Sequence, residues 1–119
     1  MDTRIKIVDA AEFIQRLDHW RTLGIVVTVA SGSFDPLLVA HAELAAAARP
    51  KGGRLALLLT ESADPILEPR ARAELAAALA SVDLVTFAGP GLPPPDLNWD
   101  HTHAAAASSF VAHVLERMS

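Results

Sequence analysis

The apolar residues of this chain follow a helical period in some segments and form continuous runs in others. Apolar positions at three- and four-residue spacing predict a helix over residues 10–24, because one of its faces is apolar throughout. Asp9 can cap this helix while Glu12 reaches back, as in a capping box, and Gly24 has the place of a terminating glycine. Residues 25–30 follow as a β-branched run without alternation, which is typical of a strand buried on both faces.

The same two patterns alternate along the rest of the chain. Further helices are predicted over residues 36–49, 70–81 and 104–118, and further buried strands over residues 54–60 and 82–87. This α-β-α-β-α-β order predicts an α/β fold in which helices flank a parallel sheet. Ligands of such sheets bind beyond the carboxyl ends of the strands. The segments that follow the three predicted strands are residues 31–35, 60–64 and 87–90.

A length of 119 residues fits one domain with a single core. We divide it into an N-terminal helix (1–24), a βαβαβ core (25–88), a proline-rich loop (89–103) and a C-terminal helix (104–119). Proline and glycine are concentrated at the start of this loop, so we expect it to be a stiff, irregular connection.

Composition narrows the range of functions. The net charge is −4, so the chain lacks the excess of Lys and Arg that binding to a nucleic-acid backbone needs. Aromatic residues make up 5% of the chain, which is too few for platforms on which bases stack. The absence of cysteine excludes disulfides, thiolate zinc sites and a cysteine nucleophile, and it suits a reducing cytoplasm. No signal-peptide pattern and no bilayer-length apolar stretch is present, so we expect a soluble, cytoplasmic protein. The 51% of hydrophobic residues, many of them alanine, fits either closely packed helices or a homodimer surface.

The turn between the first strand and the second helix is the main candidate for chemistry. Gly32 and Ser33 expose backbone N–H groups there, close to the positive end of the dipole of the following helix. Such a turn is a phosphate-binding cradle in many α/β nucleotide sites. We therefore predict phosphate binding at this turn.

The turn resembles the first signature of the cytidylyltransferase-like nucleotidyltransferases, G-x-F-D-x-x-H-x-G-H. The residues that match at the right spacing are Gly32, Phe34, Asp35 and His41. A helix ending at residues 19–24 just before the strand resembles the heptose-phosphate adenylyltransferase branch, and so does Arg72 followed eleven residues later by Asp83. The resemblance covers about residues 12–87 and implies a Rossmann-like nucleotidyltransferase fold of the HUP type.

The resemblance also implies a reaction. ATP or CTP would bind at the turn with Mg²⁺ screening its phosphates, and an oxygen of a sugar- or alcohol-phosphate would attack the α-phosphorus and release pyrophosphate. His41 would stabilise part of the developing charge, while Gly32 and Ser33 would donate backbone N–H groups. The other residues that the resemblance places at the nucleotide or its phosphates are Phe34, Asp35, Arg72, Ser108 and Ser109.

The chain departs from the family pattern at the centre of the motif. Leu38 stands where the first histidine is expected, and Ala40 replaces the glycine. Losing one preorganised donor costs about 10²–10³-fold in rate. The part after the third strand is also reduced, so three hypotheses stay open: an active enzyme, an inactive relative that acts as a binding, regulatory or dimeric module, and a structural protein whose cleft is filled by side chains such as Leu38.

Most candidate residues also have an ordinary structural explanation. Gly32 can serve the turn alone by adopting a positive φ, and Phe34 fits the core better than a ligand contact. Asp35 before Pro36 is typical of a helix N-cap. A lone histidine such as His41 is more often a core or surface residue than a ligand contact.

The same holds for the polar residues farther along the chain. Arg72 can form a surface ion pair with Glu68 or Glu74, and Ser108 and Ser109 can simply belong to an alanine-rich helix. Ser62 and Asp64 have places that fit the lining of the binding site, but loop composition alone explains them. The spacing of His101 and His103 is compatible with a metal site, but a polar loop in which Asp100 or Thr102 caps the final helix is favoured. Trp99 is expected to anchor the proline-rich loop on the body of the protein or on a second subunit.

Overall fold

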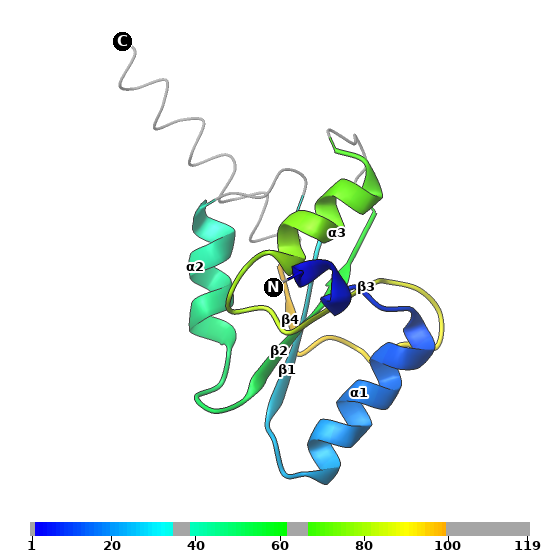
Figure 1. Ribbon diagram of the computed structural model, residues 1–119, viewed down its shortest axis with the longest axis vertical. Coiled ribbons are helices and arrows are strands. Elements are labelled where there is room, and N and C mark those ends of the chain that lie inside the picture. Colours follow the sequence, from blue (N-terminus) through cyan, green and yellow to red (C-terminus); the bar gives the residue numbers. More distant parts are fainter. Residues whose placement is uncertain (1, 35–38, 62–66, 100–119) are drawn as a thin grey trace.

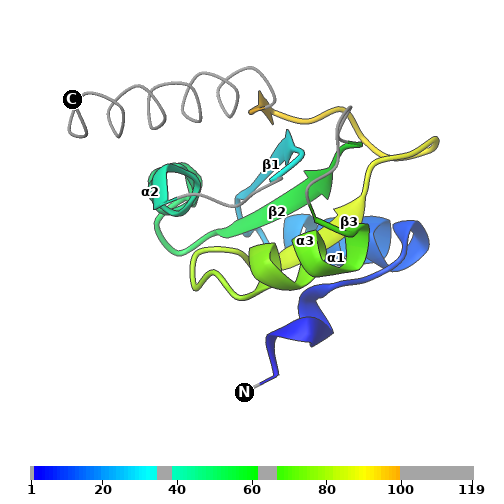
Figure 2. The ribbon, with the colours of Figure 1, turned by 90° about the horizontal axis from the view of Figure 1, so that it is seen from above.

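Four parallel strands form the centre of the computed structural model, which describes residues 2–34, 39–61 and 67–99. The strands are β1 (Val27–Gly32), β2 (Arg54–Leu59), β3 (Leu84–Phe87) and β4 (Leu97–Asn98), in the spatial order β3-β2-β1-β4. The arrows of β1, β2 and β3 point the same way in Figure 2. Because Gly32 pairs with Leu59 and Leu59 with Phe87, these strands end together at one edge of the sheet, which we call the carboxyl edge.

Helices cover both faces of this sheet, and the strands β1 and β2 are almost wholly buried between them. The helices are α1 (Ala10–Thr22), α2 (Val39–Ala48) and α3 (Pro69–Ala77), and a short 3₁₀-helix, η1 (Thr3–Lys6), precedes them. In Figure 1, α1 and α2 lie on opposite sides of the strands. Residues of α1 pack on one face, and residues of α2 and α3 pack on the other. This arrangement is a Rossmann-like α/β fold, as the sequence predicts.

The ends of α1 show why the sequence folds this way locally. The Asp9 carboxylate accepts a hydrogen bond from the Glu12 N–H at 2.8 Å, so the predicted N-cap is confirmed. Gly24 has φ +77° at the other end. The Ile25 N–H donates to the Trp20 carbonyl and the Gly24 N–H to the Arg21 carbonyl, which together form a Schellman motif. The helix therefore begins and ends where capping residues predict.

The boundaries of other elements differ from the prediction. The first strand begins at Val27 rather than residue 25, because Ile25 still closes the helix and Val26 is 64% exposed. The helix α3 ends at Ala77, after which tight turns lead to β3. The strand β4 lies inside the segment expected to be a loop, residues 89–103. The predicted C-terminal helix, residues 104–119, lies outside the described residues.

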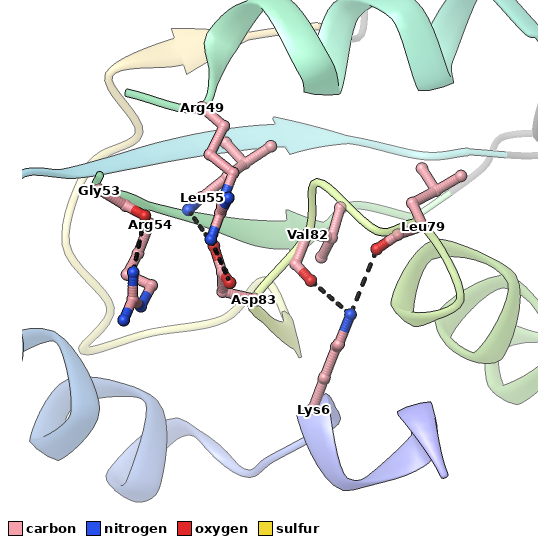
Figure 3. Close-up of polar contacts among 8 residues, drawn as sticks. All are labelled: Lys6, Arg49, Gly53, Arg54, Leu55, Leu79, Val82 and Asp83. Carbon is pink, nitrogen blue, oxygen red and sulfur yellow. Dashed lines mark hydrogen bonds and ion pairs between the residues drawn. The ribbon is translucent and has the colours of Figure 1, made fainter. Parts of the chain in front are cut away.

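Two long-range polar contacts tie the termini of these elements together (Figure 3). The Asp83 carboxylate, just before β3, accepts two hydrogen bonds from the Arg49 guanidinium after α2 and one from the Leu55 N–H of β2. The Lys6 ammonium donates to the carbonyls of Leu79 and Val82, beyond the end of α3. Both contacts lie on the turns at the amino-terminal ends of β2 and β3, so they fix the sheet from the side opposite the carboxyl edge.

Replacing Asp83 with alanine is expected to lower the free energy of unfolding by about 1.5 kcal/mol, because the Leu55 N–H loses its acceptor together with Arg49. The Arg49→Met variant removes the ion pair but leaves the bond to Leu55, and a partly exposed ion pair contributes less, so its loss is expected to be under about 1 kcal/mol. Urea denaturation of both variants measures the difference. Equal losses would show that the backbone bond contributes nothing.

Candidate functional site

The turn at the end of β1 carries the predicted phosphate-binding residues. Gly32 is the last residue of β1, and its carbonyl accepts a hydrogen bond from the Thr60 N–H at 3.0 Å. The positive φ expected of this glycine belongs instead to Phe34, whose φ is 51°. A non-glycine residue in the left-handed region costs of order 1–3 kcal/mol, so surrounding contacts must hold it there.

The ring of Phe34 supplies such contacts. It is fully buried, and it packs edge-on against the His41 imidazole at 5.3 Å and the Trp99 indole at 6.2 Å, measured between ring centroids. The prediction that Phe34 belongs to the core is therefore confirmed. Its side chain joins α2 and β4 to the turn.

His41 is buried beside this ring. The side chain, on α2, is 2% exposed, and burial lowers its pKa below the usual value. The imidazole is therefore neutral near pH 7, where it offers a hydrogen-bonding group but no formal charge. A histidine that stabilises phosphate charge from this position would act as a neutral donor.

Arg72 reaches the turn from α3. Arg72 as a whole residue is 4% exposed, and its Nη1 donates to the Ser33 carbonyl at 2.9 Å and to the Thr60 carbonyl at 2.8 Å. The interpretation of Arg72 as a surface ion-pair residue is wrong, because it is buried and Glu74 pairs with Arg70 instead. Arg72 thus joins the segments that follow β1 and β2.

The positive charge of Arg72 is not balanced within the described part of the chain. No carboxylate of residues 2–34, 39–61 or 67–99 lies within ion-pair distance of it, and its Nε has no hydrogen-bond acceptor among them. A buried guanidinium without an anion is costly, and arginine is well suited to phosphate. The arrangement therefore provides a cation at the carboxyl edge, directly behind the predicted phosphate turn.

Several predicted residues lie outside the described residues, so their roles stay predictions. They are Asp35, Leu38, Ser62, Asp64, His101, His103, Ser108 and Ser109. Among the residues that are described, no three His, Asp or Glu side chains gather as metal ligands would. The helices in this described part are all too short or too polar to cross a membrane.

The way in which β4 joins the site was not predicted from the sequence. The backbone N–H of Trp99, the residue after β4, donates to the Ser31 carbonyl at 2.7 Å. Trp99 is 5% exposed, and its indole packs against Phe34. The expectation that Trp99 anchors its loop on the body of the protein is confirmed. Its position next to the turn was not predicted, because a single tryptophan after a proline-rich stretch does not show which part of the protein it packs against.

A separate hollow lies away from these residues. It has a volume of about 220 Å³ and lies between α1 and the segment after β3. Its lining residues are Ile14, Leu17, Asp18, Arg21, Gly91, Leu92 and Pro93. None of them belongs to the turn, so the hollow and the carboxyl edge are distinct features.

Curated relatives support the family resemblance. The chain is 36% identical over 90 residues to the bifunctional protein HldE of Bradyrhizobium diazoefficiens, and 39% identical over 86 residues to HldE of Rhodopseudomonas palustris. The chain is related to the heptose-phosphate adenylyltransferase type of cytidylyltransferase-like proteins. These HldE matches cover 68% and 65% of this chain but only 18% of each relative. The match to HldE of Nitrobacter hamburgensis, 39% identical over 82 residues, covers 61% of this chain and 17% of the relative. No family model matches the chain.

Proposed function

We propose that this chain binds the phosphate groups of a nucleoside triphosphate, ATP or CTP, at the turn formed by Gly32, Ser33 and Phe34. The observation that carries the proposal is the buried Arg72 guanidinium behind this turn, without a carboxylate among the described residues. The relationship to HldE supports a nucleotidyltransferase-like function at the family level. An anionic ligand would supply the missing negative charge.

Arg72 can favour an anion without touching it. Its Nη1 contacts the Ser33 carbonyl, so the charge lies a few ångströms from the turn in a poorly solvated region. The same bond orients the Ser33–Phe34 peptide, because the C=O and N–H of a trans peptide point in opposite directions. The turn is thus held in one orientation before the ligand arrives, which lowers the entropy cost of binding.

For the transfer reaction, we propose that an acceptor oxygen of a sugar- or alcohol-phosphate attacks the α-phosphorus while the bond to pyrophosphate breaks. Mg²⁺ would enter with the triphosphate and screen its charge. The chain's own contribution would be to position the phosphates at the turn and to stabilise their charge through Arg72 and the backbone N–H groups. His41, neutral and buried, would hold the turn through Phe34.

A second candidate is a non-catalytic relative that binds nucleotide as a regulatory or dimeric module. Leu38 motivates it, because leucine has no donor where the family signature has its first histidine. The scaffold residues around it, Gly32, Phe34 and His41, are retained. Binding without turnover is the property that separates this candidate from the enzyme.

Calorimetric titration with ATP and CTP, each with and without Mg²⁺, tests the proposal. We expect binding of at least one triphosphate, and pyrophosphate release with a panel of sugar- and alcohol-phosphates tests turnover. The Leu38→His variant restores the missing donor, so it is expected to raise any turnover by about 10²-fold. Binding without release in both proteins would favour the second candidate. No binding at millimolar triphosphate would contradict both.

A further inference from the structure

The strand β4 is attached to β1 at both of its ends. Before β4, the Asp96 N–H donates to the Val29 carbonyl at 2.7 Å, and the Asp96 carboxylate accepts from the Val29 N–H at 2.8 Å. After β4, the Trp99 N–H donates to the Ser31 carbonyl at 2.7 Å. A two-residue strand has little stability of its own. These flanking bonds therefore fix where Trp99 lies.

Trp99 lies against the residue with the strained backbone. Its indole packs edge-on against Phe34, and Phe34 in turn packs edge-on against His41. Because a positive φ disfavours any residue with a Cβ, the turn keeps this shape only while packing holds the Phe34 ring. Edge-to-face aromatic pairs stabilise a fold beyond the area that they bury, so the two ring contacts oppose that strain.

We propose that Trp99 is a positioning residue for the phosphate-binding turn, and that β4 is thereby part of the binding machinery. The inference rests on the proposed function. Arg72 holds the Ser33 carbonyl from the α3 side, while Trp99 holds Ser31 and the Phe34 ring from the β4 side. The turn is the part of the carboxyl edge that both of them contact.

The Trp99→Ala variant removes the indole contact while leaving every charged residue in place. If the turn then keeps its binding shape about one tenth of the time, the apparent Kd for inorganic pyrophosphate rises about 10-fold. The Trp99→Phe variant keeps an aromatic edge, so its Kd is expected to stay within about 3-fold of the parent. Leu92→Ala is the matched control, because Leu92 packs on the α1 face of the sheet, away from the turn.

Two measurements on the folded variants test whether Trp99 positions the turn. Amide hydrogen exchange without ligand should be faster at residues 32–34 in Trp99→Ala than in Leu92→Ala, and calorimetry should show the weaker pyrophosphate binding. Asp96→Ala removes the bond between the Asp96 carboxylate and the Val29 N–H but keeps the backbone bond from the Asp96 N–H to the Val29 carbonyl and leaves the aromatic rings unchanged. The variant therefore weakens the attachment of β4 to β1, and both readouts should change in the same direction. This second variant keeps the test valid if Trp99→Ala does not fold.

The outcomes separate this inference from the proposed function. If the parent binds neither pyrophosphate nor triphosphate, the proposed function is overturned and, with it, the role of Trp99 in binding, even where exchange at the turn is faster in Trp99→Ala. Binding by the parent with equal exchange and equal Kd in Trp99→Ala, Asp96→Ala and Leu92→Ala would overturn the role of Trp99 alone. Faster exchange with an unchanged Kd would also overturn it.

Discussion

The Arg72→Met variant is expected to lose about 100-fold in affinity for triphosphate. The substitution removes the buried cation behind the turn, and an attraction of about 3 kcal/mol between this charge and a phosphate several ångströms away corresponds to about 100-fold in affinity. It also leaves the Ser33 and Thr60 carbonyls without their shared donor, so the free energy of unfolding should fall by about 2–3 kcal/mol. Calorimetry and urea denaturation of the same preparation measure both effects.

Arg70→Met is the matched control for this variant. Arg70 lies on the same helix, two residues away, and forms an exposed ion pair with Glu74. The variant carries the same change of net charge but does not touch the turn, so its affinity and stability are expected to stay close to those of the parent. Equal loss of affinity in the two variants would mean that Arg72 acts only through net charge, and would contradict a specific role for its buried guanidinium. An aspartate that pairs with Arg72 would compete with the ligand for its charge. A rise in the affinity for triphosphate in Asp35→Asn or Asp64→Asn would therefore identify that aspartate as an internal partner of Arg72.

The second large effect concerns the pH dependence of stability. Burial lowers the pKa of His41 in the folded protein below that of an ordinary histidine, about 6.5 in the unfolded chain. Below that value the unfolded chain takes up a proton at this position that the folded protein does not. Stability is therefore expected to fall as the pH decreases from about 7 through the unfolded pKa, until the folded pKa is reached, with a slope of at most about 1.4 kcal/mol per pH unit.

Urea denaturation of the parent and the His41→Gln variant between pH 7.5 and 5 measures this slope. The variant has no proton to take up at position 41, so its stability is expected to depend less on pH, whatever its stability at pH 7. His19→Gln, at an exposed position on α1, is the control for the exchange of a histidine for a glutamine. Equal slopes in the parent and His41→Gln would contradict a buried, neutral His41.

Local signals in the sequence were enough to predict the layers of the fold. Asp9 and Gly24 mark the ends of α1 because a cap is a matter of a few neighbouring residues. The continuous apolar runs of β1 and β2 predict burial on both faces, which the helices on either side of the sheet confirm. The strand β4 could not be predicted in this way, because two residues show no periodicity and its position depends on bonds to Val29 and Ser31.

The candidate site was harder to predict because its contacts connect distant segments. The sequence suggested Gly32 for the positive φ, but the tertiary packing of Phe34 places it two residues later. Arg72 has carboxylates nearby in sequence, which favoured an ion pair, whereas its partners are backbone carbonyls 39 and 12 residues away. Every residue has a backbone carbonyl, so the sequence does not show which carbonyls accept from Arg72. Only the fold brings them together.

Backbone amide chemical shifts during a titration with inorganic pyrophosphate test the central claim most directly. We expect the largest changes at the amides of Gly32, Ser33 and Phe34, with smaller ones at Thr60 and Arg72, and all of them should be lost in Arg72→Met. Changes gathered instead around Arg21 and Leu92, in the hollow beside α1, or no changes at millimolar pyrophosphate, would contradict phosphate binding at the carboxyl edge.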